Sequence, residues 1–409
     1  MRDRAVPKRG SVTENLIATD INPQIQRAPV VPKARLKLTT RALRAYGLIA
    51  ALIIVWVIFA ALTDGIFLSP RNFSNLIRQT AVTGILSVGM VVVIVAGQID
   101  LSVGSIVGLS GMVAVLAQVS LHWGLLGSLL LGLFIGLIVG AVQGALTAYA
   151  RIPAFIVTIG GLLAWRGVTK GISGGNTYPI AVHSFKTLGQ AYLSPTTGIV
   201  LMIVGVLLTI WLVLRQHRSR GLHGLTQWTP LGFLLRIAGP SILIIVFVLA
   251  LNEYAGVPVP VIILLGVALA GAFVMRNTVP GRYLHAIGGN PEAARLSGIN
   301  SRVYILGAFA ALGILAALAG MIYTARVGSA SPDAGTLLEL DAIAACVIGG
   351  ASLMGGRGTV LGALLGALFM ASLDNGMSLR NVSDYIQDIV KGAILVAAVG
   401  LDTMGRRKN

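Results

Sequence analysis

The stretch GQIDLSVGS, residues 97–105, places an acidic side chain between two apolar runs. A charge at the depth of lipid chains costs free energy, so an acid in such a run marks a candidate functional position. Asp100 could also begin a helix, because its carboxylate can accept hydrogen bonds from backbone N–H groups of the next turn, with Ser102 assisting. Three roles stay open for Asp100: a structural cap, a residue of a pathway or its gate, and a proton relay.

A second pair of acids stands in a similar setting. The stretch LLELDAIAAC, residues 337–346, carries Glu339 and Asp341 ahead of an apolar run, and the same three roles apply to them. No other reactive set is visible. The chain has no G-x-x-x-x-G-K-[ST] phosphate loop, no His pair at metal-binding spacing and a single cysteine, Cys346. We therefore expect no catalysis, cofactor or metal in this chain, and any ATP would be bound by another subunit.

The polar stretch 276–302 contains the signature of a short capped helix. Asn290 stands at the cap position, Pro291 at the first helical position, Glu292 in the first turn, and Gly298 at the end. A short exposed helix between apolar segments favours a docking element for a partner protein. An ordinary surface loop is the alternative.

These positions belong to a chain whose composition indicates a membrane protein. Of 409 residues, 56% are hydrophobic and 11% are charged, whereas soluble domains carry roughly 25% charged residues. We predict an all-α polytopic membrane protein with about 10–12 transmembrane helices, since apolar stretches of roughly 20 residues recur. Twelve apolar segments lie near 46–62, 80–97, 102–119, 123–149, 152–172, 198–214, 236–251, 257–275, 303–324, 340–355, 358–373 and 386–402. The fifth and tenth are Gly-rich, which favours broken or re-entrant segments.

The net charge of +17 does not indicate nucleic-acid binding, because the basic residues gather in tails and short loops. Ten Lys and Arg residues fall in 1–44, which we predict to be a cytoplasmic N-terminal tail by the positive-inside rule. We expect a transmembrane domain over 45–402 and a basic C-terminal tail over 403–409. Arg71 and Arg78 fall on the opposite side, as anchors at the membrane surface.

Internal similarity suggests a repeat. The stretch 81–111 resembles 305–323 followed by 337–356: in each, a Gly/Ala-rich span leads to an acid and then to a Gly-rich span. The two copies would run in opposite directions, as in the inverted repeats of transporters. Chance similarity between Gly/Ala-rich helices is the alternative. Glycines four residues apart on 132–144 and 358–366 favour close helix packing, or a face that slides.

Several of these stretches resemble the sugar-permease subunits of bacterial ABC importers, the ribose/xylose permease family. The resemblance rests on VGMVVVIVAGQIDLSVGS, on GRYLHAIGGNPEAARLSGIN and on AGTLLELDAIAACVIGGASLMGGRGTVLGALLGAL with IVKGAILVAAV, in family order. An extra two-span stretch, 199–250, together with YAGVPVP and MASLDNGMS, resembles the D-xylose type. Position 98 differs from this type, because Gln98 stands where an acidic residue is expected.

The resemblance implies a permease of the bacterial inner membrane that imports a monosaccharide, D-xylose above all. It implies two permease copies, an ABC ATPase subunit that binds ATP and Mg²⁺, and a periplasmic sugar-binding protein. Glu292, Ala293, Ala294 and Gly298 match the family's coupling core, and Arg295 could pair with the ATPase by its chemistry. Ribose, inositol, autoinducer and branched-chain amino acid permeases are alternatives. A proton-coupled sugar transporter using Asp100, Glu339 or Asp341 is a rival of another class.

Overall fold

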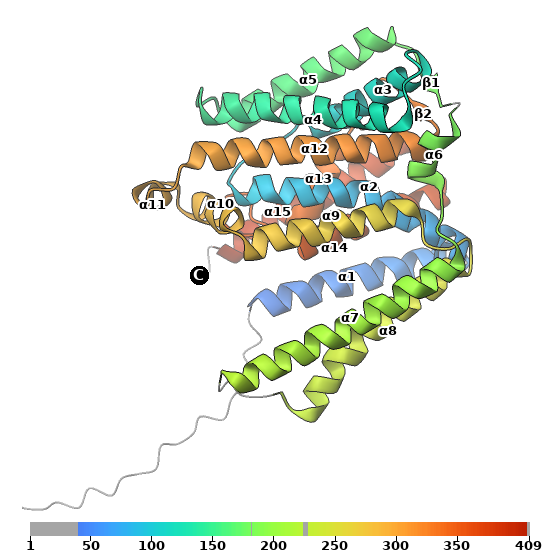
Figure 1. Cartoon of the computed structure of the whole chain (residues 1–409), viewed down its shortest axis with the longest axis vertical. Helices are drawn as coiled ribbons and strands as arrows, with labels where there is room; N and C mark the ends of the chain where they lie inside the picture. Colours follow the sequence, from blue (N-terminus) through green and yellow to red (C-terminus); the bar gives the residue numbers. More distant parts are fainter. Residues whose placement is uncertain (1–39, 181, 224–227, 407–409) are drawn as a thin grey trace, which may run out of the picture. The chain divides into compact units, whose positions relative to one another are not determined.

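The chain folds almost entirely into helices. The computed structural model describes residues 40–180, 182–223 and 228–406, with side chains from residue 47 to residue 400 in these ranges (Figure 1). The longer helices are α1 (Thr40–Leu62), α2 (Pro70–Val95), α3 (Val103–Val119), α4 (Leu125–Ala148), α5 (Ala154–Ser173), α7 (Pro195–Leu222), α8 (Pro230–Asn252), α9 (Val259–Asn277), α12 (Ser301–Val327), α14 (Val360–Leu379) and α15 (Asp384–Arg406). The short elements are η1 (Ile66–Leu68), α6 (His183–Gln190), α10 (Val279–Gly289), α11 (Pro291–Leu296), α13 (Leu338–Ile348), β1 (Tyr178–Pro179) and β2 (Ser329–Ala330).

The helices confirm the predicted all-α polytopic membrane class. Eight described helices are long and apolar enough to cross a bilayer: α2, α4, α5, α7, α8, α9, α12 and α14. Two shorter apolar helices, 47–62 and α3, join them. Each of the twelve predicted apolar segments corresponds to a helix, with α13 and α15 as the remaining two. The predicted basic tails lie mostly outside the described residues.

Helix α2 begins about ten residues before the predicted span. Residues 70–79, which the predicted spans leave between two membrane segments, are therefore helical, and Arg71 and Arg78 lie on the first three turns of α2. Ser69 caps this helix by accepting a hydrogen bond from the Asn72 backbone N–H, and Pro70 occupies the first helical turn. The first turns of this helix were not predicted because they contain polar residues. Asn72 is one of them: it faces inward and exchanges two amide hydrogen bonds with Asn375 of α14.

The fifth predicted span is one unbroken helix, α5, whereas the tenth is cut to the 11 residues of α13. The Gly-rich sequence favoured a break in both, but the glycines Gly160, Gly167 and Gly171 of α5 are exposed helix positions with open space around them. The predicted loop 276–302 likewise contains two helices, α10 and α11, rather than one.

The connections gather at the two ends of the helices (Figure 1). One end holds the α4–α5 turn, the last turn of α7, α10, α11 and the end of α15. The other holds α6, β1, β2 and the link between α12 and α13, where Tyr178 pairs with Ala330. We call the first of these two ends the α11 end.

Close helix packing explains the glycine spacing on α4. A Cβ on Gly136 or Gly140 would strike the backbone of α12 at Gly313 or Phe309. The same holds on α14, where a Cβ on Gly366 would strike the Ala345 carbonyl of α13. Only a residue without a side chain permits this approach of two backbones. Helix α2 is the most buried of the eight long apolar helices, since 83% of the residues in its most apolar 18-residue stretch are buried. It packs against α9, α12, α13 and α14.

The contacts between helices follow the internal repeat. Helices α2 to α5 correspond to α12 to α15, and exchanging the two sets turns one group of contacts into the other. The contacts of α12 with α3 and α4 become those of α2 with α13 and α14, and the α3 contacts with α4 and α5 become those of α13 with α14 and α15. Helices α2 and α12 run in opposite directions, as an inverted repeat requires (Figure 1).

Candidate functional site

The first turns of α3 and α13 meet inside the protein, and we call these two the interrupted helices. Helix α13 has 11 residues and rises about 16 Å at 1.5 Å per residue, about half the roughly 30 Å of a bilayer's hydrocarbon core. Its first turn packs against the first turn of α3: a Cβ on Gly104 would strike the Glu339 carboxylate and the Gly335 carbonyl. Non-helical backbone precedes both helices, over 96–102 and 328–337. Irregular backbone at membrane depth occurs only where protein or water covers it.

Asp100 lies in the first of these segments and is fully buried. Its Oδ1 accepts hydrogen bonds from the Ser102 backbone N–H at 2.8 Å and from the Ser102 hydroxyl at 2.6 Å. The Gln143 amide of α4 donates to the Ser102 hydroxyl oxygen at 2.9 Å. Asp100 therefore holds the residue before α3 rather than capping N–H groups of its first turn, which corrects the predicted cap.

The other carboxylate oxygen of Asp100, Oδ2, is buried without a hydrogen-bond partner among the described residues. Glu339 of α13 has the same feature: its side chain is buried and its Oε2 finds no partner in the described part of the chain. Buried carboxylate oxygens without partners are costly. Such atoms mark positions where a proton, a water or a substrate hydroxyl could be accepted.

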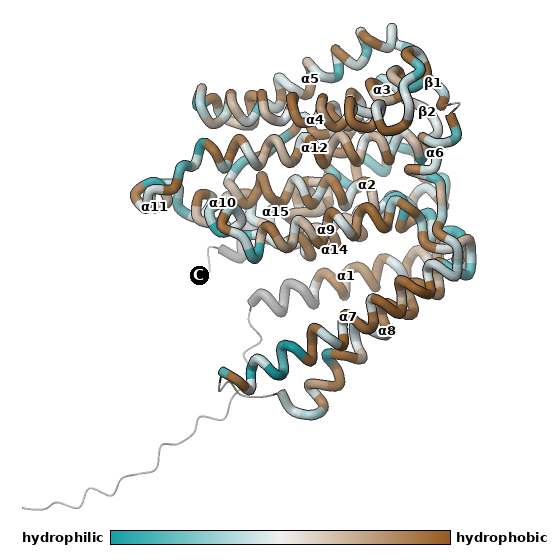
Figure 2. Tube along the Cα trace, in the orientation of Figure 1, coloured by the Kyte–Doolittle hydropathy of each residue, from teal (hydrophilic) through white to brown (hydrophobic). Residues whose placement is uncertain are grey.

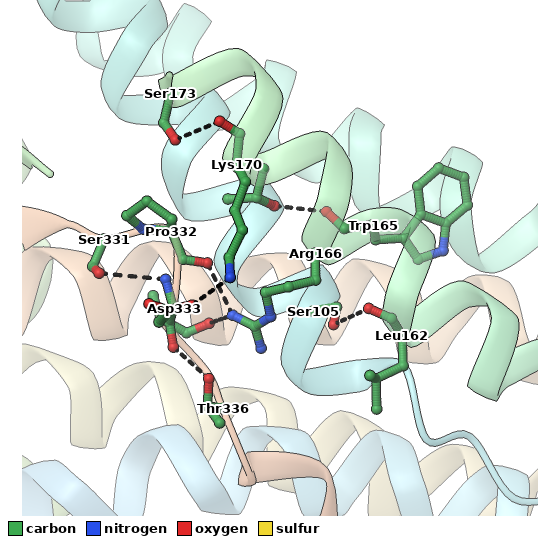
Figure 3. Close-up of polar contacts among 12 residues, drawn as sticks. Ser105, Leu162, Trp165, Arg166, Lys170, Ser173, Ser331, Pro332, Asp333 and Thr336 are labelled. Atoms are coloured by element: carbon green, nitrogen blue, oxygen red, sulfur yellow. Dashed lines mark hydrogen bonds and ion pairs between the residues drawn. The ribbon is translucent and has the colours of Figure 1, made fainter. Parts of the chain in front are cut away.

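Arg166 of α5 holds the second irregular segment (Figure 3). Its Nη1 donates to the carbonyl oxygens of Ala334 at 2.6 Å and Pro332 at 3.1 Å. One turn later, Lys170 pairs with Asp333 at 3.3 Å. From the other side, the Ser105 hydroxyl of α3 donates to the Leu162 carbonyl of α5. Helix α5 thus positions both the segment 331–336 and the start of α3.

Asp341 belongs to a separate ionic group. Lys391 of α15 lies 2.9 Å from the Asp374 carboxylate of α14 and 3.5 Å from that of Asp341 on α13. Because one ammonium group faces two carboxylates from different helices, it ties the short α13 to its neighbours. The structure therefore separates Asp341 from Asp100 and Ser102, although all were predicted as pathway or gate candidates.

The short helix α11 has the predicted geometry. The Asn290 side chain accepts a hydrogen bond from the Ala293 backbone N–H at 3.0 Å, Pro291 occupies the first turn, and Gly298 follows the helix with φ of +78°. Of the six helical residues only Ala294 is buried. Leu296 is 75% exposed, so α11 presents an apolar side chain beside its charged ones.

Glu292 and Arg295 pair with each other on the exposed side of α11. The Arg295 guanidinium donates twice to the Glu292 carboxylate, at 2.6 Å and 3.2 Å. The hydrogen bond to Arg295 lowers the pKa of Glu292 below its ordinary value. Exposed pairs contribute little to folding. The pair instead presents a fixed arrangement of one negative and one positive charge at the protein surface.

Helix α10 joins α11 to the interrupted helices. A Cβ on Gly288 of α10 would strike the Val95 carbonyl at the end of α2, and it would lie 2.6 Å from the Gly356 amide nitrogen. That amide donates to the same Val95 carbonyl at 2.8 Å. The ends of α10 and α2 and the segment after α13 therefore share one backbone contact at Val95, five residues before Asp100.

Sequence reasoning missed four residues that hold this site: Gln143, Arg166, Gly288 and Lys391. Arg166 and Lys391 carried a signal, since each is a basic residue inside an apolar helix. Gln143 and Gly288 carried none, because their importance comes from contacts between distant segments. Among the described residues, no group of three or more His, Cys, Asp or Glu side chains is placed to hold a metal ion.

Comparisons with known proteins place these features in a family. A family described as the branched-chain amino acid transport system / permease component matches residues 72–399. The chain is 46% identical to the xylose transport system permease protein XylH of Escherichia coli, over 90% of this chain and 93% of the relative. The xylose transport system permease protein of Haemophilus influenzae is 44% identical, with 91% and 99% covered.

More distant relatives include the ribose import permease protein RbsC of Escherichia coli, 36% identical over 86% of this chain and 91% of that protein. No solved structure matches the chain. The family match covers most of the chain and includes α2, α3, α11 and α13. The chain therefore belongs to the family described as the branched-chain amino acid transport system / permease component.

Proposed function

We propose that this chain is the membrane permease subunit of an ATP-driven importer of D-xylose. The observation that carries the proposal is 46% identity, over 90% of the chain, to a permease named for xylose transport. A ribose import permease reaches 36%. The ATPase subunit would bind ATP and Mg²⁺, a periplasmic sugar-binding protein would deliver the sugar, and a second copy of this chain would complete the channel.

In this proposal α11 is the contact with the ATPase. Asn290 and Gly298 limit the helix, Ala293 and Ala294 form its body, and Glu292 and Arg295 present their charges outward. Movement of α11 would pass through α10 to the shared contact at Val95. Asp100, Ser102, Glu339 and Asp341 would hold the interrupted helices that open and close the pathway.

Reconstituted uptake tests the proposal. Proteoliposomes with this chain, the ATPase subunit and the binding protein should accumulate labelled D-xylose only with ATP and Mg²⁺ inside. Ribose and branched-chain amino acids serve as competitors. The buried carboxylates favour a proton-coupled transporter as the rival, which predicts accumulation by this chain alone under a pH gradient. That result would overturn the proposal.

Reversing the charge at Glu292 tests the role of α11. We expect Glu292→Lys to remain folded in the membrane, because the side chain is exposed, but to lose most ATP-dependent uptake. The double variant Glu292→Lys/Arg295→Glu is the control, since it restores an internal pair but reverses the charges that a partner meets. Recovery of uptake in the double variant would assign the effect to the pair itself and refute the docking role.

A further inference from the structure

The hairpin formed by α7 and α8 ends in a basic and aromatic group that the transport proposal does not use. We call it the hairpin tip. It consists of Trp211, Arg215, Arg218 and Arg220 of α7, with Trp228 just before α8 and Arg236 in the second turn of α8. Figure 2 shows that the long apolar stretch of α7 changes to hydrophilic residues here, at the α11 end.

The tip carries positive charge without acidic neighbours in sequence. The chain has no Asp or Glu between Asp100 and Glu253, so the hairpin itself supplies no counter-charge. Arg215, Arg218 and Arg236 are exposed. None of these three forms an ion pair with an acid of the described residues, whereas Lys170, Arg295 and Lys391 all do.

Aromatic rings hold the guanidinium groups in place. The Arg236 guanidinium lies 4.4 Å from the Trp228 ring centre, and that of Arg220 lies 5.5 Å from the same ring. Arg215 lies 5.4 Å from the Trp211 ring. One donor is already used, since Arg236 Nη1 donates to the Gly232 carbonyl at 3.1 Å. The other edge N–H groups of a stacked guanidinium stay available, in a planar fork that matches phosphate oxygens. Tryptophan itself prefers the membrane–water interface.

The tip also lies at the depth of lipid headgroups. The stretch 195–214 of α7 rises about 30 Å, which equals the usual thickness of the hydrocarbon core. Arg215 is the first charged residue beyond it. In the most apolar 18-residue stretches of α7 and α8, only 6% and 17% of the residues are buried within the protein. Both helices therefore expose most of their apolar surface directly beneath the arginines.

We propose that the hairpin tip binds the phosphate of an anionic phospholipid in the leaflet at the α11 end. The phosphate would lie among Arg215, Arg218 and Arg236, and the acyl chains would lie along the apolar faces of α7 and α8. Basic residues next to a transmembrane helix recognise anionic headgroups. The inference is independent of the transported substrate.

Fluorescence quenching tests the inference on the full-length protein. Nanodiscs of phosphatidylcholine would contain an equal mole fraction of brominated phosphatidylglycerol or brominated phosphatidylcholine. The difference between the wild-type chain and Trp228→Phe isolates the signal of Trp228. We expect severalfold stronger quenching of Trp228 by the brominated anionic lipid, reduced by high salt because the attraction is electrostatic.

Charge-neutral variants locate the ligand. Arg215→Gln, Arg218→Gln and Arg236→Gln should each weaken the preference for the anionic lipid by about fivefold. The exposed Arg276 and Arg302, which also lie at the α11 end, provide matched controls as Arg276→Gln and Arg302→Gln. The controls should keep the preference.

Four results would overturn the inference. Equal quenching of wild-type Trp228 by the two lipids would show that no selective site exists, and this result needs no variant. Persistence of the preference in all three tip variants would place the lipid elsewhere. Displacement of the brominated lipid by millimolar inorganic phosphate would identify a free anion as the ligand. If instead the tip variants lose the ATPase subunit while keeping the lipid preference, the tip is a protein contact.

Discussion

At the scale of single residues, Asp100 joins a structural and a functional possibility in one side chain. One carboxylate oxygen accepts two hydrogen bonds from Ser102, which fixes the backbone before α3. The other oxygen is buried and has no partner among the described residues. A purely structural anchor would use only the first oxygen, so the two possibilities can be separated by substitution.

Asparagine and leucine at position 100 distinguish these roles. Asp100→Asn keeps an acceptor oxygen for Ser102, so we expect near-normal thermal stability. Asp100→Leu leaves the buried Ser102 N–H unsatisfied, which should cost about 1–3 kcal/mol. Thermal unfolding in detergent and ATP-dependent uptake are the two measurements. Equal loss of uptake in both variants, with stability lost only in the leucine variant, would mean that the charge itself is needed.

At the scale of elements, the connection from α11 to the interrupted helices depends on a contact that only glycine permits. We expect Gly288→Ala to separate α10 from Val95 and Gly356, because the added methyl group meets backbone atoms that cannot move aside cheaply. Uptake should fall at least tenfold while the ATPase subunit still binds. The measurements are uptake and co-purification of the two subunits.

The next glycine supplies the matched control. A Cβ on Gly289 has as its nearest neighbour the Gly356 Cα at 4.0 Å, which is ordinary contact. Gly289→Ala should therefore behave like the wild-type chain. If both variants transport normally, α10 does not carry the motion of α11 to α2, and another contact, such as that between α11 and α12, must do so.

Some elements could be predicted from sequence because their causes are local. The cap at Asn290, the proline after it and the glycine at 298 sit within nine residues, and the structure confirms all three. The predicted start of α2 was wrong because Asn72 is typical of a loop in the sequence, whereas in the structure it is paired with Asn375 of α14. Arg166 carried a signal as a basic residue inside an apolar helix, but its role could not be predicted, because its carbonyl partners lie more than 160 residues away.

At the scale of the whole molecule, the α7–α8 hairpin is an appendage on a symmetric core. The helices α2 to α5 and α12 to α15 form the two halves of the inverted repeat, and the hairpin belongs to neither. Its two ends come together: the Leu193 backbone N–H donates to the Val257 carbonyl at 2.8 Å, and that of Val259 donates to the Ala191 carbonyl at 2.9 Å. A short linker could therefore replace the hairpin without moving α9.

We expect the chain that joins Ser194 to Gly256 through a short Gly-Ser linker to insert in the membrane and to retain ATP-dependent uptake. Its stability should fall, because Phe73 of α2 loses its edge-to-face contact with Phe247 of α8, worth about 0.5–1.5 kcal/mol. The buried Val248 and Leu251 of α8 also leave the apolar cluster that they share with α9. Phe73→Ala in the full-length chain measures that contact separately. The shortened chain should also lose its preference for anionic lipid. Transport should survive because the two halves of the core contact each other directly. A shortened chain that unfolds or fails to transport would show that the hairpin is an integral part of the pathway, and the division into core and appendage would be wrong.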